Sequence, residues 1–236
     1  MTEINTRAKT TAASYDEGLR NHFRSVYNVM SFGLVLTGII AYIVANTPAI
    51  VNILFGNPMM AIIVAFAPLA FIFFGFTPNA VRRKSSRQLK TMFLLFSAVF
   101  GLSLSSVFLV YAQADIARAF FITAATFAGT SVYGYITKKD LSGLGGLLIM
   151  GVIGLLIAIV VNMFLQSSAL DFAISVIGVM VYMGLVAYDT QNIKETYSAS
   201  HGHEANDKMA VMGALSLYIN FIMLFQFILS LIGNRE

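Results

Sequence analysis

The sequence predicts an all-α integral membrane protein, folded as a bundle of seven transmembrane helices. Of its 236 residues, 58% are hydrophobic and only 11% are charged, and the mean hydropathy is +0.78. Soluble domains carry charges at about a quarter of their positions. Apolar runs of about 20 residues, the length that crosses a bilayer as a helix, recur along the chain. The composition therefore excludes an ordinary soluble domain.

Seven such runs define the predicted spans: residues 26–47, 58–77, 91–112, 116–137, 144–165, 169–191 and 209–232. We divide the chain into an N-terminal tail (1–24), a transmembrane domain (25–232) and a short C-terminal tail (233–236). The first tail is polar and has no compact apolar region followed by a small-residue cleavage site, so we expect no removable signal peptide. Pro68 lies inside the second span, where its missing backbone donor is expected to produce a kink.

The distribution of lysine and arginine predicts the orientation. Of 15 such residues, all but Arg118 and Arg235 lie in the N-terminal tail or in the loops that follow the second, fourth and sixth spans. Cytoplasmic loops carry this excess, so the N-terminus and these loops are expected in the cytoplasm. Because the basic residues are explained as topology signals, the net charge of +4 predicts no nucleic-acid partner.

Several classes of chemistry are excluded. The chain has no cysteine, and it contains neither a glycine-rich phosphate loop nor an HExxH motif. An intramembrane aspartyl protease needs two carboxylates that share a proton, and the last span offers only Asn220. We therefore predict no enzyme and no cofactor. The His201–Glu204 segment matches no zinc spacing and is assigned to solvent, whereas His22 is interpreted as part of a basic patch that faces anionic lipid headgroups.

The residues that stand out are Asp189, near the end of the sixth span, and Asn220, near the middle of the seventh. Ionisable residues within membrane spans are rare and usually functional. Asp189 is either the first residue of a polar loop or, as we prefer, a functional acid whose charge responds to burial and to neighbouring cations. Asn220, taken alone, is best explained by an interhelical hydrogen bond. The predicted spans place Asp189 about two turns nearer the cytoplasm, so the two meet only if span six is longer or span seven starts later.

Arg82 and Arg83 follow the second span on the side of Asp189. They are either anchors that set the topology or, in a second interpretation, a latch that pairs with ionised Asp189 and opens when the acid is protonated.

Small and hydroxylic residues recur at four-residue spacing in spans three and four: Ser97, Gly101 and Ser105, then Thr126, Thr130 and Gly134. Such a face either packs closely against another helix or lines a polar path.

Four stretches, Ala128–Tyr135, Thr137–Gly146, Ala187–Lys194 and Ala214–Phe225, together resemble the Bax inhibitor-1 family, and in particular its bacterial members. The resemblance covers all seven spans. It implies a seven-helix bundle with a central last helix, located in the bacterial inner membrane, and a pH-sensitive calcium leak. It also implies a hydrogen-bonded pair of aspartates on helices six and seven, and an arginine latch at the end of helix two.

Asp189 falls on the helix-six aspartate, and Arg82 or Arg83 falls near the latch. The helix-seven aspartate is replaced by Asn220, which hydrogen bonds but does not titrate. Asp189 alone is a weak calcium site, because that ion takes six to eight oxygens.

The sequence thus predicts a passive, pH-modulated cation leak that is gated near Asp189, with calcium as the candidate ion. The opposing hypothesis, also from the resemblance, is a modulator of a membrane-anchored ATP-dependent protease, contacted through the N-terminal tail. A proton-coupled transporter is disfavoured, because Asn220 leaves no second titratable group at the midplane.

Overall fold

The structure, a computed structural model, describes the backbone of residues 2–233 and the side chains of residues 15–233. Every element in this part of the chain is a helix. The ten helices are α1 (Thr2–Ala45), α2 (Pro48–Phe55), α3 (Pro58–Gly75), α4 (Pro78–Arg83), α5 (Ser86–Leu104), α6 (Val107–Val110), α7 (Gln113–Ile136), α8 (Ser142–Leu165), α9 (Ser168–Thr196) and α10 (His203–Ile232). Seven segments are long and apolar enough to cross a membrane, which confirms the predicted fold class.

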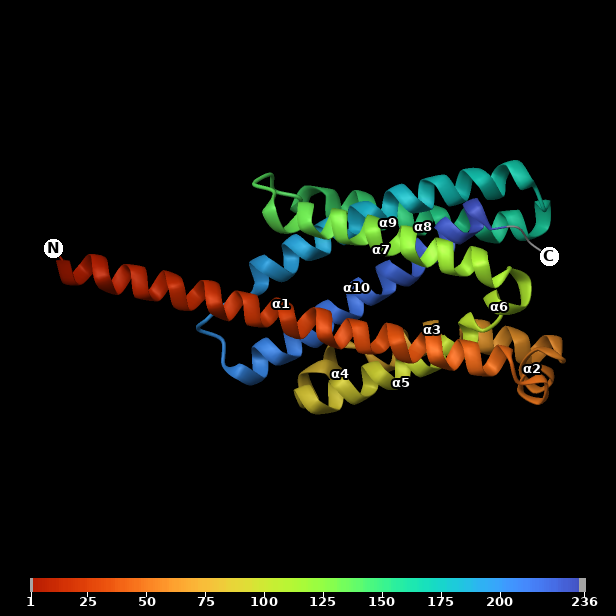
Figure 1. Ribbon diagram of the computed structural model, residues 1–236, viewed down its shortest axis with the longest axis horizontal. Coiled ribbons are helices and arrows are strands. Elements are labelled where there is room, and N and C mark those ends of the chain that lie inside the picture. Colours follow the sequence, from red (N-terminus) through yellow and green to blue (C-terminus); the bar gives the residue numbers. More distant parts are fainter. Residues whose placement is uncertain (1, 234–236) are drawn as a thin grey trace.

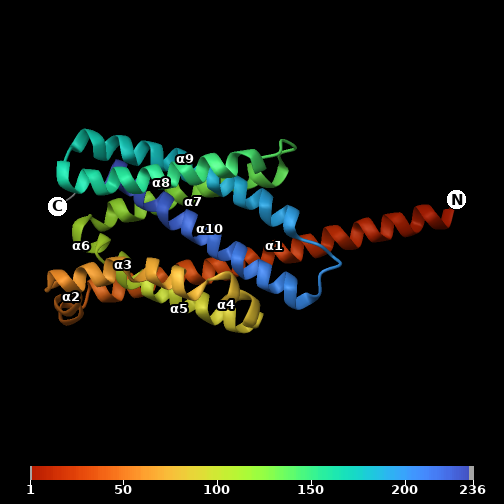
Figure 2. The same ribbon diagram turned by 180° about the vertical axis from the view of Figure 1, so that it is seen from behind.

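The helices form two groups with the last helix between them. One group contains α1 to α6 and the other contains α7, α8 and α9 (Figure 1). Helix α10 crosses obliquely between the groups and packs against α1 and α5 on one side and against α7 and α9 on the other (Figures 1 and 2). The predicted central position of the last helix is therefore confirmed.

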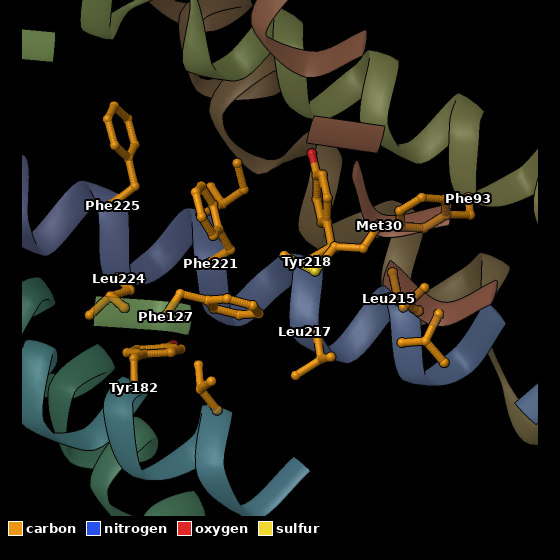
Figure 3. Close-up of a cluster of buried hydrophobic side chains, with 14 of the residues drawn as sticks. Met30, Phe93, Phe127, Tyr182, Leu215, Leu217, Tyr218, Phe221, Leu224 and Phe225 are labelled. Atoms are coloured by element: carbon orange, nitrogen blue, oxygen red, sulfur yellow. The ribbon is translucent and has the colours of Figure 1, made fainter. Parts of the chain in front are cut away.

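Protein surrounds most of the circumference of helix α10. Half of its 30 residues are buried, from Ala210 to Leu229, whereas most helices at the outside of the bundle bury only one narrow face against the protein. Figure 3 shows Tyr218 beside Met30 and Phe93 of the first group, while Leu224 lies near Phe127 of the second. A helix that is apolar on all sides is stable only where protein or lipid covers every face.

The polar loops gather at one end of the bundle, which we call the basic end. Figure 1 shows the α7–α8 and α9–α10 connections and α4 toward the end from which α1 projects, whereas α2 and the α8–α9 turn lie at the far end. The α4–α5 corner is sharp because Ser85 and Gln88 form a capping box at the start of α5. Pro48, Pro58 and Pro78 each occupy a first turn, where no backbone donor is needed.

Three helix boundaries differ from the predicted spans. Helix α1 is continuous from Thr2, so the predicted tail 1–24 is helical as far as it is described, and of the predicted tail 233–236 only Gly233 is described. Helix α9 continues to Thr196 and α10 begins at His203. Hydropathy reports where the lipid ends, but a helix can continue beyond that point when its polar side chains find partners.

The small residues of span three support close packing. A methyl group on Gly101 would lie 2.9 Å from the carbonyl oxygen of Thr37 on α1, and the Ser97 hydroxyl is buried and bonds the Phe93 carbonyl of its own helix. In span four the prediction was less accurate. Thr130 bonds its own helix and is partly exposed, and the buried face runs instead through Ser131 to Gly134.

Candidate functional site around Asp189

The segment Ala187–Lys194 near the end of α9 joins the second helix group to α10. Its side chains point around the helix to different neighbours: Ala187 packs on Gly134 of α7, Tyr188 on Gly145 of α8, and Ile193 on Gly213 of α10. A glycine at each of these contacts lets the helices approach closely. The segment therefore fixes the positions of three neighbouring helices relative to α9.

The polar side chains of the same segment form hydrogen bonds with neighbouring elements. Thr190 bonds the Ser131 hydroxyl at 3.0 Å, and Gln191 bonds the α7–α8 connection at Leu141 N (2.7 Å) and Lys139 O (2.9 Å). Lys194 donates to the carbonyl of Tyr135 at 2.8 Å, in the last turn of α7. Carbonyls there lack partners within their own helix, and a cation is favourable beside them. These bonds explain why α9 remains helical through its polar end.

Asp189 points away from these contacts, toward α10. Its Oδ2 atom accepts hydrogen bonds from the Ser216 hydroxyl and, at 2.7 Å, from the Asn220 side-chain amide. Ser216 and Asn220 lie one turn apart on α10 and so share a face. No donor reaches Oδ1 within the described residues, and Oδ1 is not among their buried unpartnered atoms. One carboxylate oxygen is thus held by α10 and the other faces open space.

That space is a crevice of about 230 Å³ between α9 and α10. Its other walls include Asn192 and Thr196, which are exposed at the basic end, and Met209 and Met212 of α10. Asn220, which is bonded to Asp189, is only 5% exposed and is not among the crevice walls. Asp189 therefore lies in a crevice with mixed polar and apolar walls that extends toward Thr196 at the basic end.

Beyond Asn220 the contact between α9 and α10 becomes apolar. The rings of Tyr182 and Phe227 meet with centroids 5.7 Å apart, and a methyl group on Gly178 would touch the Phe227 ring. Tyr182 precedes Asp189 by seven residues, about 10 Å along the helix. On the α7 side, Phe127 and Phe221 are also in contact (Figure 3). This aromatic layer separates the crevice from the far end of the bundle.

Neither Arg82 nor Arg83 pairs with Asp189; in the described part of the chain the ion pair shown joins Arg118 to Asp115. The arginines end α4, beside the first turns of α10, where Lys208 donates to the Arg82 carbonyl at 3.4 Å. Ser216 lies eight residues further along α10, about 12 Å away by the helical rise. The predicted latch is therefore not closed in this arrangement, because the α4–α5 corner holds the arginines near the start of α10.

Glu204 of α10 also contacts the α4–α5 corner. Its carboxylate accepts from the backbone amide of Ser86 at 2.6 Å and from the Ser86 hydroxyl at 2.9 Å. Ser86 is the first residue of α5, and a helix N-terminus favours a negative charge. The prediction that this segment faces solvent is right for His201 and His203, which are exposed, but it missed the contact of Glu204 with α5.

Sequence reasoning selected Asp189 and Asn220, but it missed Ser216, although the four-residue spacing from Asn220 is a signal for a shared face. The doubt about depth is resolved because α9 continues five residues past the predicted end and α10 is inclined across the bundle (Figure 1). Among the described residues, no group of three His, Asp or Glu side chains is arranged to hold a metal ion. Asp189 with one amide and one hydroxyl offers too few oxygens for a resident calcium ion.

His22 is not part of a lipid-facing patch, which corrects the prediction. Its side chain is only 6% exposed, and its ring lies against Tyr197 with centroids 5.2 Å apart. His22 shares the inner face of α1 with Phe23 and Val26, whereas Arg20 and Arg24 point outward. The three-residue segment between the arginines turns His22 toward the protein because neighbouring positions on a helix point in different directions.

Comparison with known proteins agrees with this architecture. The family described as "Inhibitor of apoptosis-promoting Bax1" matches residues 19–236. The inner membrane protein YbhL of Escherichia coli K12 is 42% identical over 93% of this chain and 94% of its own. A protein of Caulobacter vibrioides is 45% identical over 94% and 92%, and a membrane protein of Streptococcus pyogenes is 34% identical over 94% and 96%. The chain belongs to the Bax inhibitor-1 family.

Proposed function

We propose that this protein is a passive cation leak pathway of the bacterial inner membrane, with calcium as the candidate ion and Asp189 as its gating residue. The observation that supports the proposal most is the position of Asp189: a carboxylate that forms no ion pair among the described residues, in a crevice inside a membrane bundle. An acid in such a place is costly and rare, and where one occurs it usually marks an ion or substrate pathway. The presence of an inner membrane protein among the similar proteins supports the location.

In this proposal the structure corresponds to a closed state. Cations enter the crevice from the basic end, which we place in the cytoplasm from the distribution of lysine and arginine, and the layer of Tyr182 and Phe227 blocks further passage. The Ser216 and Asn220 donors are strengthened by the negative charge of Asp189. Protonation removes that charge, weakens the contact of α9 with α10 and favours opening.

The arginine latch remains part of the hypothesis only as a second closed arrangement. Arg82 and Arg83 lie on the same end of the bundle as the crevice, near the start of α10. A shift of the first turns of α10 would have to bring one of them toward Asp189. The single carboxylate, with Asn220 in place of a second acid, is expected to give one titration step rather than two coupled ones.

The test is calcium flux into proteoliposomes that contain the purified protein at neutral pH. Wild type is compared with Asp189→Asn and with Glu195→Gln, a matched control that neutralises an exposed acid on the same helix. We expect wild type and Glu195→Gln to leak at the same rate and Asp189→Asn to differ several-fold. Because the proposal makes the ionised state closed, silence of correctly inserted wild-type protein at both neutral and mildly acidic pH would refute the leak.

A second candidate is the modulator of a membrane-anchored ATP-dependent protease. The observation that favours it is the N-terminal part of α1, whose backbone projects beyond the bundle at the basic end (Figure 1). The two functions have different requirements. Deletion of residues 2–14 should abolish a modulator and leave the leak unchanged, whereas Asp189→Asn should alter the leak and leave a modulator unchanged.

A further inference from the structure

A groove runs between α1 and α7 at the basic end, on the surface that faces the lipid. It has a volume of about 430 Å³. Its walls are Arg20, Phe23, Arg24, Tyr27 and Asn28 of α1, and Ser131, Val132 and Tyr135 of α7. Neither the proposed leak nor the crevice at Asp189 uses this groove.

The charged residues of the groove lie toward the basic end. Arg20, Arg24 and Asn28 repeat every four residues, so that they form one exposed stripe on α1. Further toward the membrane interior the walls carry no charge: Tyr27, Asn28 and Ser131 lie there with Val132, which is 58% exposed. A groove that is cationic near the interface and uncharged further in matches the charged headgroup and uncharged acyl chains of an anionic phospholipid.

A third cation lies close to the same place. The Lys194 ammonium group is 5.0 Å from the centre of the Tyr135 ring, and it bonds the Tyr135 carbonyl. The rings of Phe23 and Tyr135 also meet edge to face, with centroids 5.0 Å apart. Asp16 and Glu17 lie on the preceding turn of α1, and neither forms an ion pair with Arg20 or Arg24 among the described side chains.

The floor of the groove is rigid. The Tyr27 hydroxyl is hydrogen bonded to Ser131, and Ser131 bonds Thr190 at 3.0 Å. Ser131 and Thr190 are both buried. The polar groups below the groove therefore satisfy one another, and the arginine side chains and apolar walls remain for an occupant.

From the order of these charges and walls, we propose that the groove binds one anionic phospholipid of the leaflet at the basic end, with its phosphate at Arg20 and Arg24 and an acyl chain over Tyr27 and Val132. The arginine guanidinium binds phosphate through two parallel hydrogen bonds. Attraction of an anionic headgroup to each basic residue at the interface corresponds to about a fivefold preference. This inference is independent of the leak.

The chain contains no tryptophan, so one introduced fluorophore reports on one site. We would place it by Val132→Trp in the groove and, in a second protein, by Leu147→Trp on α8, which is also exposed to lipid near the basic end. Each protein is reconstituted in mixtures of phosphatidylglycerol and phosphatidylcholine in which only one lipid carries brominated, quenching acyl chains. The quenching gives the local preference for the anionic lipid.

We expect several-fold stronger preference for phosphatidylglycerol at position 132 than at position 147. The preference should fall to the level of position 147 when Arg20→Gln and Arg24→Gln are combined, and should be largely kept when both become lysine. Equal preference at the two positions would overturn the proposal in favour of general attraction to the basic end, as would a preference that survives the glutamine pair. Relief of quenching by soluble glycerophosphate would overturn it in favour of a soluble phosphate ligand.

Discussion

Among the side chains of the segment that carries Asp189, Gln191 makes the contribution to the free energy of unfolding that is easiest to measure. Its Oε1 accepts from the Leu141 amide at 2.7 Å and its Nε2 donates to the Lys139 carbonyl at 2.9 Å. Gln191 and Leu141 are both buried, whereas Lys139 is exposed. In Gln191→Met, a change of similar volume, the buried amide loses its partner, at about 1–3 kcal/mol. The carbonyl regains water, so its loss is about 1 kcal/mol.

We therefore expect Gln191→Met to lower the free energy of unfolding by about 2–4 kcal/mol. The measurement is unfolding by sodium dodecyl sulfate in mixed micelles, followed by circular dichroism. Gln113→Met is the control, because Gln113 is exposed at the start of α7, and its effect should stay within about 0.5 kcal/mol. A Gln191 variant as stable as the control would refute the conclusion that this residue holds the α7–α8 connection.

Three further predictions concern the same end of the bundle. Gly134→Leu should destabilise the fold by at least about 1–3 kcal/mol, because its side chain would meet the backbone of α9, whereas Gly129→Leu, with no atom within 4 Å of its added methyl, should be neutral in the same unfolding assay. Glu204→Gln should speed hydrogen exchange of the first amides of α5, since a charged acceptor is lost there; unchanged exchange would contradict that role. Hydrogen bonds from the hydroxyl and amide of Ser142 lower the pKa of Asp140. Their contribution to stability is therefore present above the ordinary pKa of an aspartate and is lost as the pH falls through the lowered pKa of Asp140. In Ser142→Ala, NMR titration of the Asp140 carboxyl should show its pKa moving back up.

The span count followed from the sequence because it depends on hydropathy, which is a local property of each run, whereas the central last helix was expected only from the family resemblance. The helix ends did not follow from the sequence, because they depend on side-chain partners from elsewhere in the chain. Lys194 looks like a loop residue in sequence, yet its bond to the Tyr135 carbonyl keeps it helical. That extension moves Asp189 inward and makes its contact with Asn220 possible.

The candidate site was also predicted only in part, because some of its contacts depend on residues from elsewhere in the chain. Asp189 and Asn220 stand out because polar groups are conspicuous within apolar runs, whereas Ser216 is too small and too common to stand out. The position of Arg82 and Arg83 depends on how the α4–α5 corner docks on α10, through Glu204 and Lys208. No pattern within either segment predicts that contact. The sequence alone therefore could not decide whether the arginines are topology anchors or a latch.

The central claim is that the charge of Asp189 gates a leak, and the pH response of that leak tests it most directly. Calcium entry into proteoliposomes would be followed at neutral and mildly acidic pH for wild type, Asp189→Asn and the control Glu195→Gln. The account predicts faster entry at acidic pH for wild type and for the control, and the same rate at both pH values for Asp189→Asn. If Asp189→Asn keeps the full wild-type response to pH, Asp189 is not the gate and the account is contradicted.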